Sequence, residues 1–141
     1  MVESSPQTDR DLDSIRQART LARRAKAAQT RLAELNQEQI DRIVDAMASA
    51  AAAQAGPFAR MAVEETGYGL EADKVRKNLF AADTIYRFIK PMRTVGVIAR
   101  HDDVRVVDIA EPFGVVAAIV PSTNPTSTAI YKLLVCLKAR C

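Results

Sequence analysis

The chain has 141 residues, of which 48% are hydrophobic and 26% are charged, and these values are typical of one soluble domain. Its 20 basic and 17 acidic side chains are interleaved, so the net charge of +3 gives little attraction for nucleic acid. No apolar run approaches the roughly 20 residues that a membrane span needs, and the start MVESSPQTDRD lacks the apolar stretch of a secretory signal. We therefore expect a cytoplasmic protein that has neither nucleic acid nor a membrane as its partner.

The first part of the chain is polar and then helical in pattern. Residues 1–11 include SSPQTD and are typical of a flexible N-terminus. Four mainly amphipathic helices are expected within residues 12–95. In the first, over 12–32, apolar residues recur at intervals of three and four, and the basic residues are best explained as a solvated face. The second helix begins after Asn36, which forms the pattern of a capping box with Gln39.

The next two helices are bounded by glycine and proline. The third is expected to start at the break Gly56-Pro57, with Pro57 at its first position, and to end at Gly67. The fourth should stop before Pro91, because the residue before a proline disfavours the helical conformation. Between these helices, GYGLEA at 67–72 has the spacing of a dinucleotide-binding loop. We reject that assignment because such a loop must follow a strand, whereas the preceding segment is helical.

Beyond residue 95 the hydrophobic pattern changes from helix to strand. The β-branched segment VRVVDIA at 104–110 is joined through EPFG to the apolar run VVAAIV at 115–120, which predicts a hairpin-like segment. Because the second run is apolar on both faces, it should be covered on both sides, as strands of a parallel sheet are. The helix that follows it completes a β-α unit. The predicted class is therefore α/β.

The turn VPSTNP at 120–125 is the candidate ligand site. Asn124 stands at the N-cap position of the last helix, and Pro125 stands at the first helical position, where its missing N–H is not needed. The carboxyl end of a parallel strand facing a helix N-terminus is where open α/β sheets bind ligands. Two roles of Asn124 stay open and are compatible. Its side-chain oxygen can cap the helix, and its NH₂ group can donate to a substrate oxygen.

The other residues able to carry chemistry are few. His101 lies in a polar connector with Asp102 and Asp103 and is best explained as part of a solvated turn, so no metal site is predicted. Cys136 falls among the leucines of the last helix and is most simply a small core residue. Helical spacing would set Cys141 on another face, so we expect both thiols to be reduced.

The stretch EPFGVVAAIVPSTNPTSTAIYKLLVCLKAR, with QEQIDRIVDAM, MAVEETGYG and DKVRKN, resembles the CoA-acylating aldehyde dehydrogenases. These include the N-terminal half of the bifunctional aldehyde-alcohol dehydrogenases. The match runs over about residues 12–140, and hydrolytic members of the family usually carry a bulky aromatic residue where this chain has Thr123. The resemblance implies the N-terminal part of an aldehyde dehydrogenase-like fold. In it, 12–95 form the helical region, and 96–141 form strands and the first β-α unit of a Rossmann-like nucleotide-binding domain, which is incomplete.

The resemblance also implies a reaction, in which an aldehyde, coenzyme A and NAD, or NADP, give acyl-CoA and the reduced cofactor. In those enzymes a cysteine thiolate attacks the aldehyde, and an asparagine amide helps to hold the oxyanion. The matching motif puts that asparagine at Asn124. The neighbouring Val120, Pro121, Ser122 and Thr123 would line the nicotinamide side of the cofactor cleft. The family's nucleophile lies far downstream, so the chain alone is expected to be inactive.

Two function classes remain open. The first is enzymatic: the chain is the N-terminal part of an acylating aldehyde dehydrogenase, which acts on a small aldehyde and is a homo-oligomer when complete. The second is a non-catalytic fragment that acts through binding, for example by pairing with subunits of the same family. A doubly covered strand needs parallel neighbours, and no residues follow the last helix to form the next strand. We therefore interpret the chain as the front piece of a longer enzyme.

Overall fold

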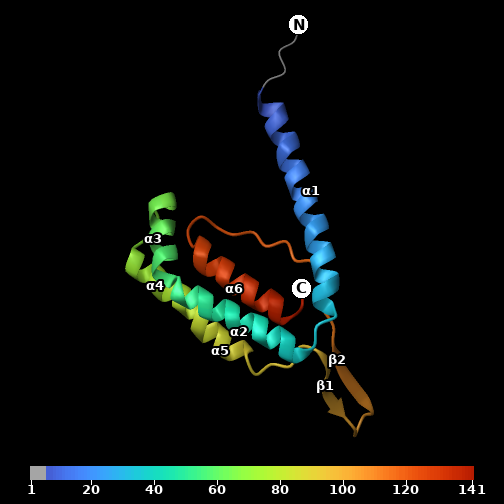
Figure 1. Cartoon of the computed structure of the whole chain (residues 1–141). Coiled ribbons are helices and arrows are strands. Elements are labelled where there is room, and N and C mark those ends of the chain that lie inside the picture. The colour runs from blue at the N-terminus through green and yellow to red at the C-terminus, as the bar shows by residue number, and fades with distance from the viewer. Residues whose placement is uncertain (1–5) are drawn as a thin grey trace.

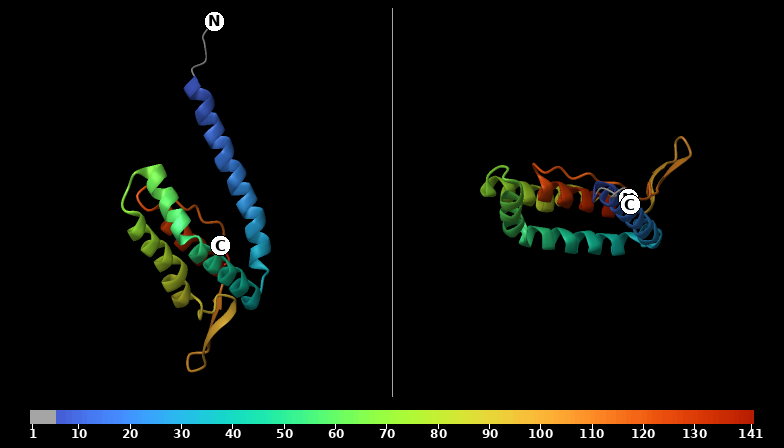
Figure 2. Two further views of the ribbon diagram at one scale, coloured as in Figure 1. Left: turned by 60° about the vertical axis from the view of Figure 1, so that its left-hand side comes forward. Right: turned by 90° about the horizontal axis from the view of Figure 1, so that it is seen from above.

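The computed structural model describes residues 6–141 and shows a body of packed helices from which a long helix and a β-hairpin project (Figures 1 and 2). Its elements are α1 (Pro6–Ala33), α2 (Gln37–Ala53), α3 (Ala55–Thr66), α4 (Glu71–Leu79), the π-helical segment η1 (Phe80–Ile85), α5 (Tyr86–Ile89), β1 (Gly96–His101), β2 (Val106–Ala110) and α6 (Pro125–Lys138). Because α4, η1 and α5 follow one another directly, four helical stretches precede the first strand of the described chain, as expected.

Local signals set the helix ends. The capping box is confirmed: Asn36 Oδ1 accepts from the Gln39 amide at 2.9 Å, and Gln39 Oε1 accepts from the Asn36 amide at 3.0 Å. Gly67 ends α3 in the left-handed conformation, with φ of 68°, and its N–H donates to the Val63 carbonyl. Helix α3 begins at Ala55, slightly before the predicted start at the Gly-Pro break.

The core lies between α2, η1, α5 and α6, and Figure 1 shows α6 running beside α2. Its buried residues are Ile40, Val44, Ala48, Ala81, Ala82, Ile89, Ile130 and Leu134. Full burial of a large aliphatic side chain contributes about 1.5–3 kcal/mol. Several of these residues are alanines, which let the helix backbones approach closely. The helical half of the chain therefore has a core of its own, and α6 belongs to it.

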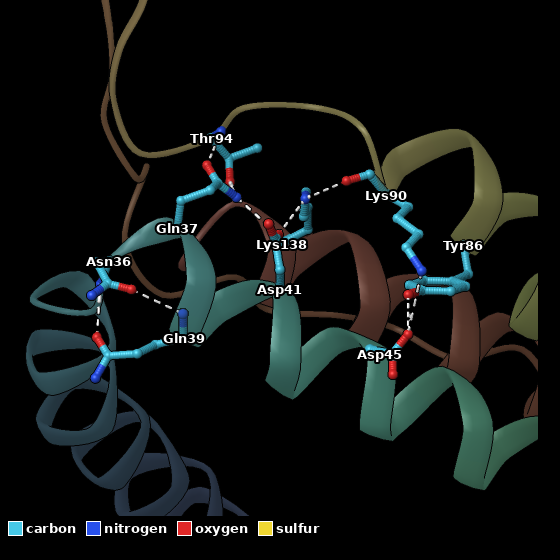
Figure 3. Close-up of polar contacts among 9 residues, drawn as sticks. All are labelled: Asn36, Gln37, Gln39, Asp41, Asp45, Tyr86, Lys90, Thr94 and Lys138. Carbon is cyan, nitrogen blue, oxygen red and sulfur yellow. Dashed lines mark hydrogen bonds and ion pairs between the residues drawn. The ribbon is translucent and has the colours of Figure 1, made fainter.

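Polar contacts fasten the C-terminal end of α6 to α2 and to the segment after α5 (Figure 3). The side chain of Lys138 is 4% exposed, and its Nζ donates to Asp41 Oδ1 at 2.5 Å and to the Lys90 carbonyl at 2.9 Å. The segment after α5 is tied to the start of α2 as well, because the Thr94 amide donates to Gln37 Oε1 at 2.8 Å. These contacts fix α6, whose other end carries the candidate site.

The hairpin differs from the predicted one. Strands β1 and β2 are antiparallel, with Gly96 opposite Ala110 and His101 opposite Val106. The prediction joined 104–110 to a strand at 115–120 and overlooked β1. His101 is the last residue of β1, and its Nε2 lies 3.0 Å from Asp108 Oδ2. Within residues 6–141 no group of three or more potential metal ligands is found.

The predicted strand at 115–120 is wrong, although the helix that should follow it is present. Residues 111–121 have no regular secondary structure, and the sheet of the described chain has only β1 and β2. A strand exists through its hydrogen-bonded ladder, and no partner strand lies beside this segment. Instead it runs past α1 and along α6, where Lys132 Nζ donates to the Ile119 carbonyl at 2.6 Å (Figure 1).

The N-terminal helix projects from the body (Figures 1 and 2). The terminus predicted to be flexible, 1–11, lies partly outside the described residues, and its described part, 6–11, belongs to α1. The N-terminal part of its apolar stripe faces solvent, with Leu12 60% exposed and Leu21 63% exposed, whereas Leu32 near its end packs against the core. None of the described helices has the length and apolar character needed to cross a membrane.

Candidate functional site

One face of α4 holds the turn that precedes α6. Lys74 is 3% exposed, and its Nζ donates to the Thr123 carbonyl at 2.8 Å. One turn later, Lys77 Nζ donates to the side-chain oxygen of Asn124 at 2.9 Å. The spacing of these lysines puts them on the same side of the helix. Two successive residues of the candidate turn are thus bound by one helix, one through its backbone and the other through its side chain.

A third residue on this face, Asn78, supports the start of α6. It is fully buried, its Nδ2 donates to the Ala55 carbonyl at 2.9 Å, and its Oδ1 accepts from Thr126 Oγ1 at 2.8 Å. Asn78 therefore ties α3, α4 and the first turn of α6 together. The supporting role of these residues was not predicted from the sequence. Their signal was the segment DKVRKN, whose polar side chains recur at three and four and so share a helix face.

Asn124 stands at the N-cap position of α6, and Pro125 follows in the first turn, as predicted. The expected capping bond is wrong, however, because the Asn124 side chain makes no hydrogen bond to the helix amides. Its backbone, with φ of −141° and ψ of 61°, differs from the extended conformation usual at an N-cap. With its oxygen engaged by Lys77, Asn124 has the NH₂ group to offer as a donor.

The residues predicted to line the cofactor cleft lie on the surface. Val120 is 43% exposed, Pro121, Ser122 and Thr123 are exposed, and Asn124 is half-buried. The turn therefore offers an apolar side chain, a proline ring and a hydroxyl next to an amide donor. That mixture suits a flat ring with a polar substituent, and the amides at the start of α6 suit negative charge. The chemistry of these groups is compatible with a nicotinamide cofactor.

An apolar cavity of about 510 Å³ lies between the C-terminal half of α1, residues 115–120 and α6. Cys136 and Cys141 both line it, and both are half-buried free thiols. This corrects two expectations: Cys136 is not a buried core residue, and Cys141 does not face elsewhere. Burial, and then the neighbouring Cys141, raise the pKa of the Cys136 thiol, so Cys136 is a poor nucleophile at neutral pH.

Comparisons with known proteins identify the family of the chain. The model of the aldehyde dehydrogenase family matches residues 6–141. The bifunctional aldehyde-alcohol dehydrogenase AdhE of Escherichia coli K12 is 46% identical over 127 residues, which are 90% of this chain and 14% of that protein. The acetylating succinate-semialdehyde dehydrogenase of Clostridium kluyveri is 39% identical, over 85% of this chain and 26% of its own length.

A solved structure shows the same fold. The acetylating aldehyde dehydrogenase from Geobacillus thermoglucosidasius superposes with a TM-score of 0.91 and 54% identity, over 92% of this chain and 29% of its own. The chain belongs to the aldehyde dehydrogenase family, and its named relatives include acylating enzymes. The predicted fold class, the N-terminal part of an aldehyde dehydrogenase-like fold, is confirmed. The chain spans between 14% and 29% of the length of the three relatives described here.

Proposed function

We propose that this chain forms the N-terminal part of an NAD-dependent, CoA-acylating aldehyde dehydrogenase. The complete enzyme would convert an aldehyde, coenzyme A and NAD to acyl-CoA and NADH, with NADP as the alternative cofactor. Relatives named as acetylating or acylating enzymes support the reaction class. The observation that carries the proposal is the turn before α6, where Lys77 binds the Asn124 oxygen and leaves the Asn124 NH₂ group to donate.

In this proposal the Asn124 NH₂ group donates to the substrate oxygen as negative charge develops on it. Removal of one such donor typically lowers the rate on the order of 10²- to 10³-fold. The amides at the start of α6 reinforce the effect because the N-terminal end of a helix carries partial positive charge. Val120 and Pro121 would face the nicotinamide ring, with Ser122 and Thr123 beside it. The bound cofactor supplies the acceptor for the hydride.

The chain by itself should not oxidise aldehydes. A catalytic thiolate needs surroundings that lower its pKa, whereas burial raises the pKa of Cys136. Cys136 and Cys141 also lie near the C-terminal end of α6, whereas Asn124 lies at its N-terminal end. Purified chain can be assayed with NAD, coenzyme A and short aldehydes. Turnover that disappears in Cys136→Ser or Cys141→Ser would contradict this prediction.

A chimaera tests the proposed function directly. Residues 12–140 replace the matching segment of the Geobacillus enzyme, which is 54% identical to this chain. We expect NADH formation that depends on both coenzyme A and an aldehyde, at a rate comparable with that of the parent enzyme. Replacing NAD by NADP in the same assay compares the two cofactors. A chimaera that folds, as judged by its circular dichroism and melting temperature, but makes no acyl-CoA would refute the proposal.

A further inference from the structure

Helix α6 ends in a Schellman motif that brings two cysteines together. The Cys141 amide donates to the Cys136 carbonyl at 2.8 Å, and the Arg140 amide donates to the Leu137 carbonyl at 3.0 Å. Arg140 has the left-handed conformation that this motif requires, with φ of 59°. The motif commonly brings the side chains at its first and last positions into contact across the helix end. Here these positions are Cys136 and Cys141.

The rest of the protein holds this turn in place. Arg140 is 6% exposed, and its guanidinium donates to the carbonyls of Ala33 in α1 and Ala110 in β2, both at 2.8 Å. Its own carbonyl accepts from Gln29 Nε2 at 3.4 Å. A left-handed conformation is unfavourable for a residue other than glycine, so these contacts offset a cost of about 1–2 kcal/mol. The two cysteine backbones are therefore fixed next to each other.

The two thiols are also open to the same space. Cys136 and Cys141 are free, half-buried, and part of the lining of the apolar cavity beside α6. A small reagent that enters this cavity reaches both residues. Burial, and then the neighbouring Cys141, raise the pKa of the Cys136 thiol, so we assign to Cys136 the second attack, which is intramolecular and needs less thiolate.

We propose that Cys136 and Cys141 form a dithiol site that closes to an intrachain disulfide by exchange with a small disulfide such as oxidised glutathione. The Cys141 thiolate attacks one glutathione sulfur, which forms a mixed disulfide and releases one glutathione thiolate. The Cys136 thiolate then attacks the Cys141 sulfur and releases the second glutathione. The two protons lost by the protein thiols go to the two glutathione thiolates. The two protein thiols are oxidised, and one glutathione disulfide is reduced.

This site is independent of the proposed aldehyde chemistry. It lies at the end of α6 opposite to Asn124, and it needs neither NAD nor coenzyme A. Failure of the enzymatic proposal would therefore leave the dithiol proposal untouched, and the reverse also holds.

The test uses the purified 141-residue chain at low concentration with oxidised glutathione, followed by mass spectrometry of the intact chain and of its peptides. We expect a product that has lost two hydrogen atoms, carries a Cys136–Cys141 link and has no disulfide bond between chains. Cys136→Ser and Cys141→Ser should each stop at the mixed disulfide. The matched control is Leu133→Cys combined with Cys136→Ser, because residue 133 lines the same cavity but lies outside the Schellman motif. It should also stop at the mixed disulfide.

Two further measurements show whether the folded geometry of the turn promotes formation of the Cys136–Cys141 disulfide. The closure rate of the native chain should exceed its rate in concentrated urea, where the motif is lost. Phenylarsine oxide, which needs two adjacent thiols, should bind once per native chain and protect both thiols from a thiol-counting reagent. Accumulation of doubly glutathionylated chain, of disulfide-linked dimers, or equal closure rates in buffer and in urea would overturn the proposal.

Discussion

Tyr86 lies where α5 meets α2, and its hydroxyl donates to Asp45 Oδ1 (Figure 3). Lys90 Nζ lies 5.3 Å from the centre of the tyrosine ring and 3.7 Å from the same carboxylate oxygen. Burial raises the pKa of Tyr86, the hydrogen bond to Asp45 raises it further, and the bond to Lys90 acts in the opposite direction. Since the folded-state pKa is above the ordinary value of 10.0, the neutral phenol stabilises the fold below pH 10.0.

This arrangement predicts a stability that falls as the pH rises through the folded-state pKa of Tyr86. Asp45→Asn should bring that pKa only part of the way back, because burial, the largest cause, remains. The ultraviolet absorbance of the phenolate follows the titration, and Tyr86→Phe identifies which transition belongs to this residue. If the Tyr86 titration in the absorbance curve has the same midpoint in Asp45→Asn, the carboxylate does not affect the pKa of Tyr86.

The position of Asn124 could be predicted from sequence, but its hydrogen-bond partner could not. Asn-Pro before an apolar stripe marks a helix start, which is a local signal. The bond from Lys77 joins residues 47 positions apart and exists only because α4 packs against α6. The same holds for the Schellman turn, where the contacts of Arg140 come from α1 and β2. Side-chain partners of this kind depend on the tertiary fold.

The helices were predicted well because their boundaries depend on residues nearby in the sequence. The capping box at Asn36 and the left-handed glycine at Gly67 are confirmed. The run at 115–120 was assigned as a strand from its composition, yet a strand also needs a partner that the described chain does not provide. The π-helical segment within 80–85 was not predicted either, since the apolar spacing of four and three fits an ordinary α-helix.

Gly56 at the start of α3 and Gly67 just after its end give a matched test of the helix ends. Gly67 has φ of 68° and nothing within 4 Å of an added Cβ, so Gly67→Ala should cost about 1–2 kcal/mol through conformation alone. Gly56 also has open space around it, but it precedes Pro57 in the first turn of α3, where a Cβ before proline disfavours the helical conformation. This penalty opposes the gain in helix propensity, so Gly56→Ala should change stability by less than about 1 kcal/mol. Urea unfolding followed by circular dichroism measures both values. The assignment of the α3 terminus fails if Gly67→Ala costs no more than Gly56→Ala.

Apolar surface is exposed on the side of the molecule where residues 115–120 run along α6. The exposed fractions are 44% for Val115, 48% for Val116, 85% for Ile119 and 51% for Leu133. Next to these side chains lies the cavity of about 510 Å³. So many large apolar side chains exposed on neighbouring segments favour association.

The isolated chain should therefore bind a hydrophobic dye and self-associate, although its helical half retains a core. Ile119→Ser should reduce dye binding with little change in helix content, because this side chain is largely exposed. Dye fluorescence and gel filtration measure the two effects. A sharp, reversible unfolding transition of a monomer that binds no dye would show that the chain covers its own apolar surface.

For the complete enzyme, the decisive measurement is the turnover of the chimaera that carries Asn124→Asp. Aspartate keeps an oxygen for Lys77 and is favourable near a helix N-terminus, so the melting temperature should barely change. The substitution removes the NH₂ donor and puts negative charge beside the developing oxyanion, so turnover should fall on the order of 10²- to 10³-fold. Asn124→Ala, which loses both the oxygen and the donor, is the matched control. Near-normal turnover of Asn124→Asp would contradict the assignment of Asn124 as the oxyanion donor.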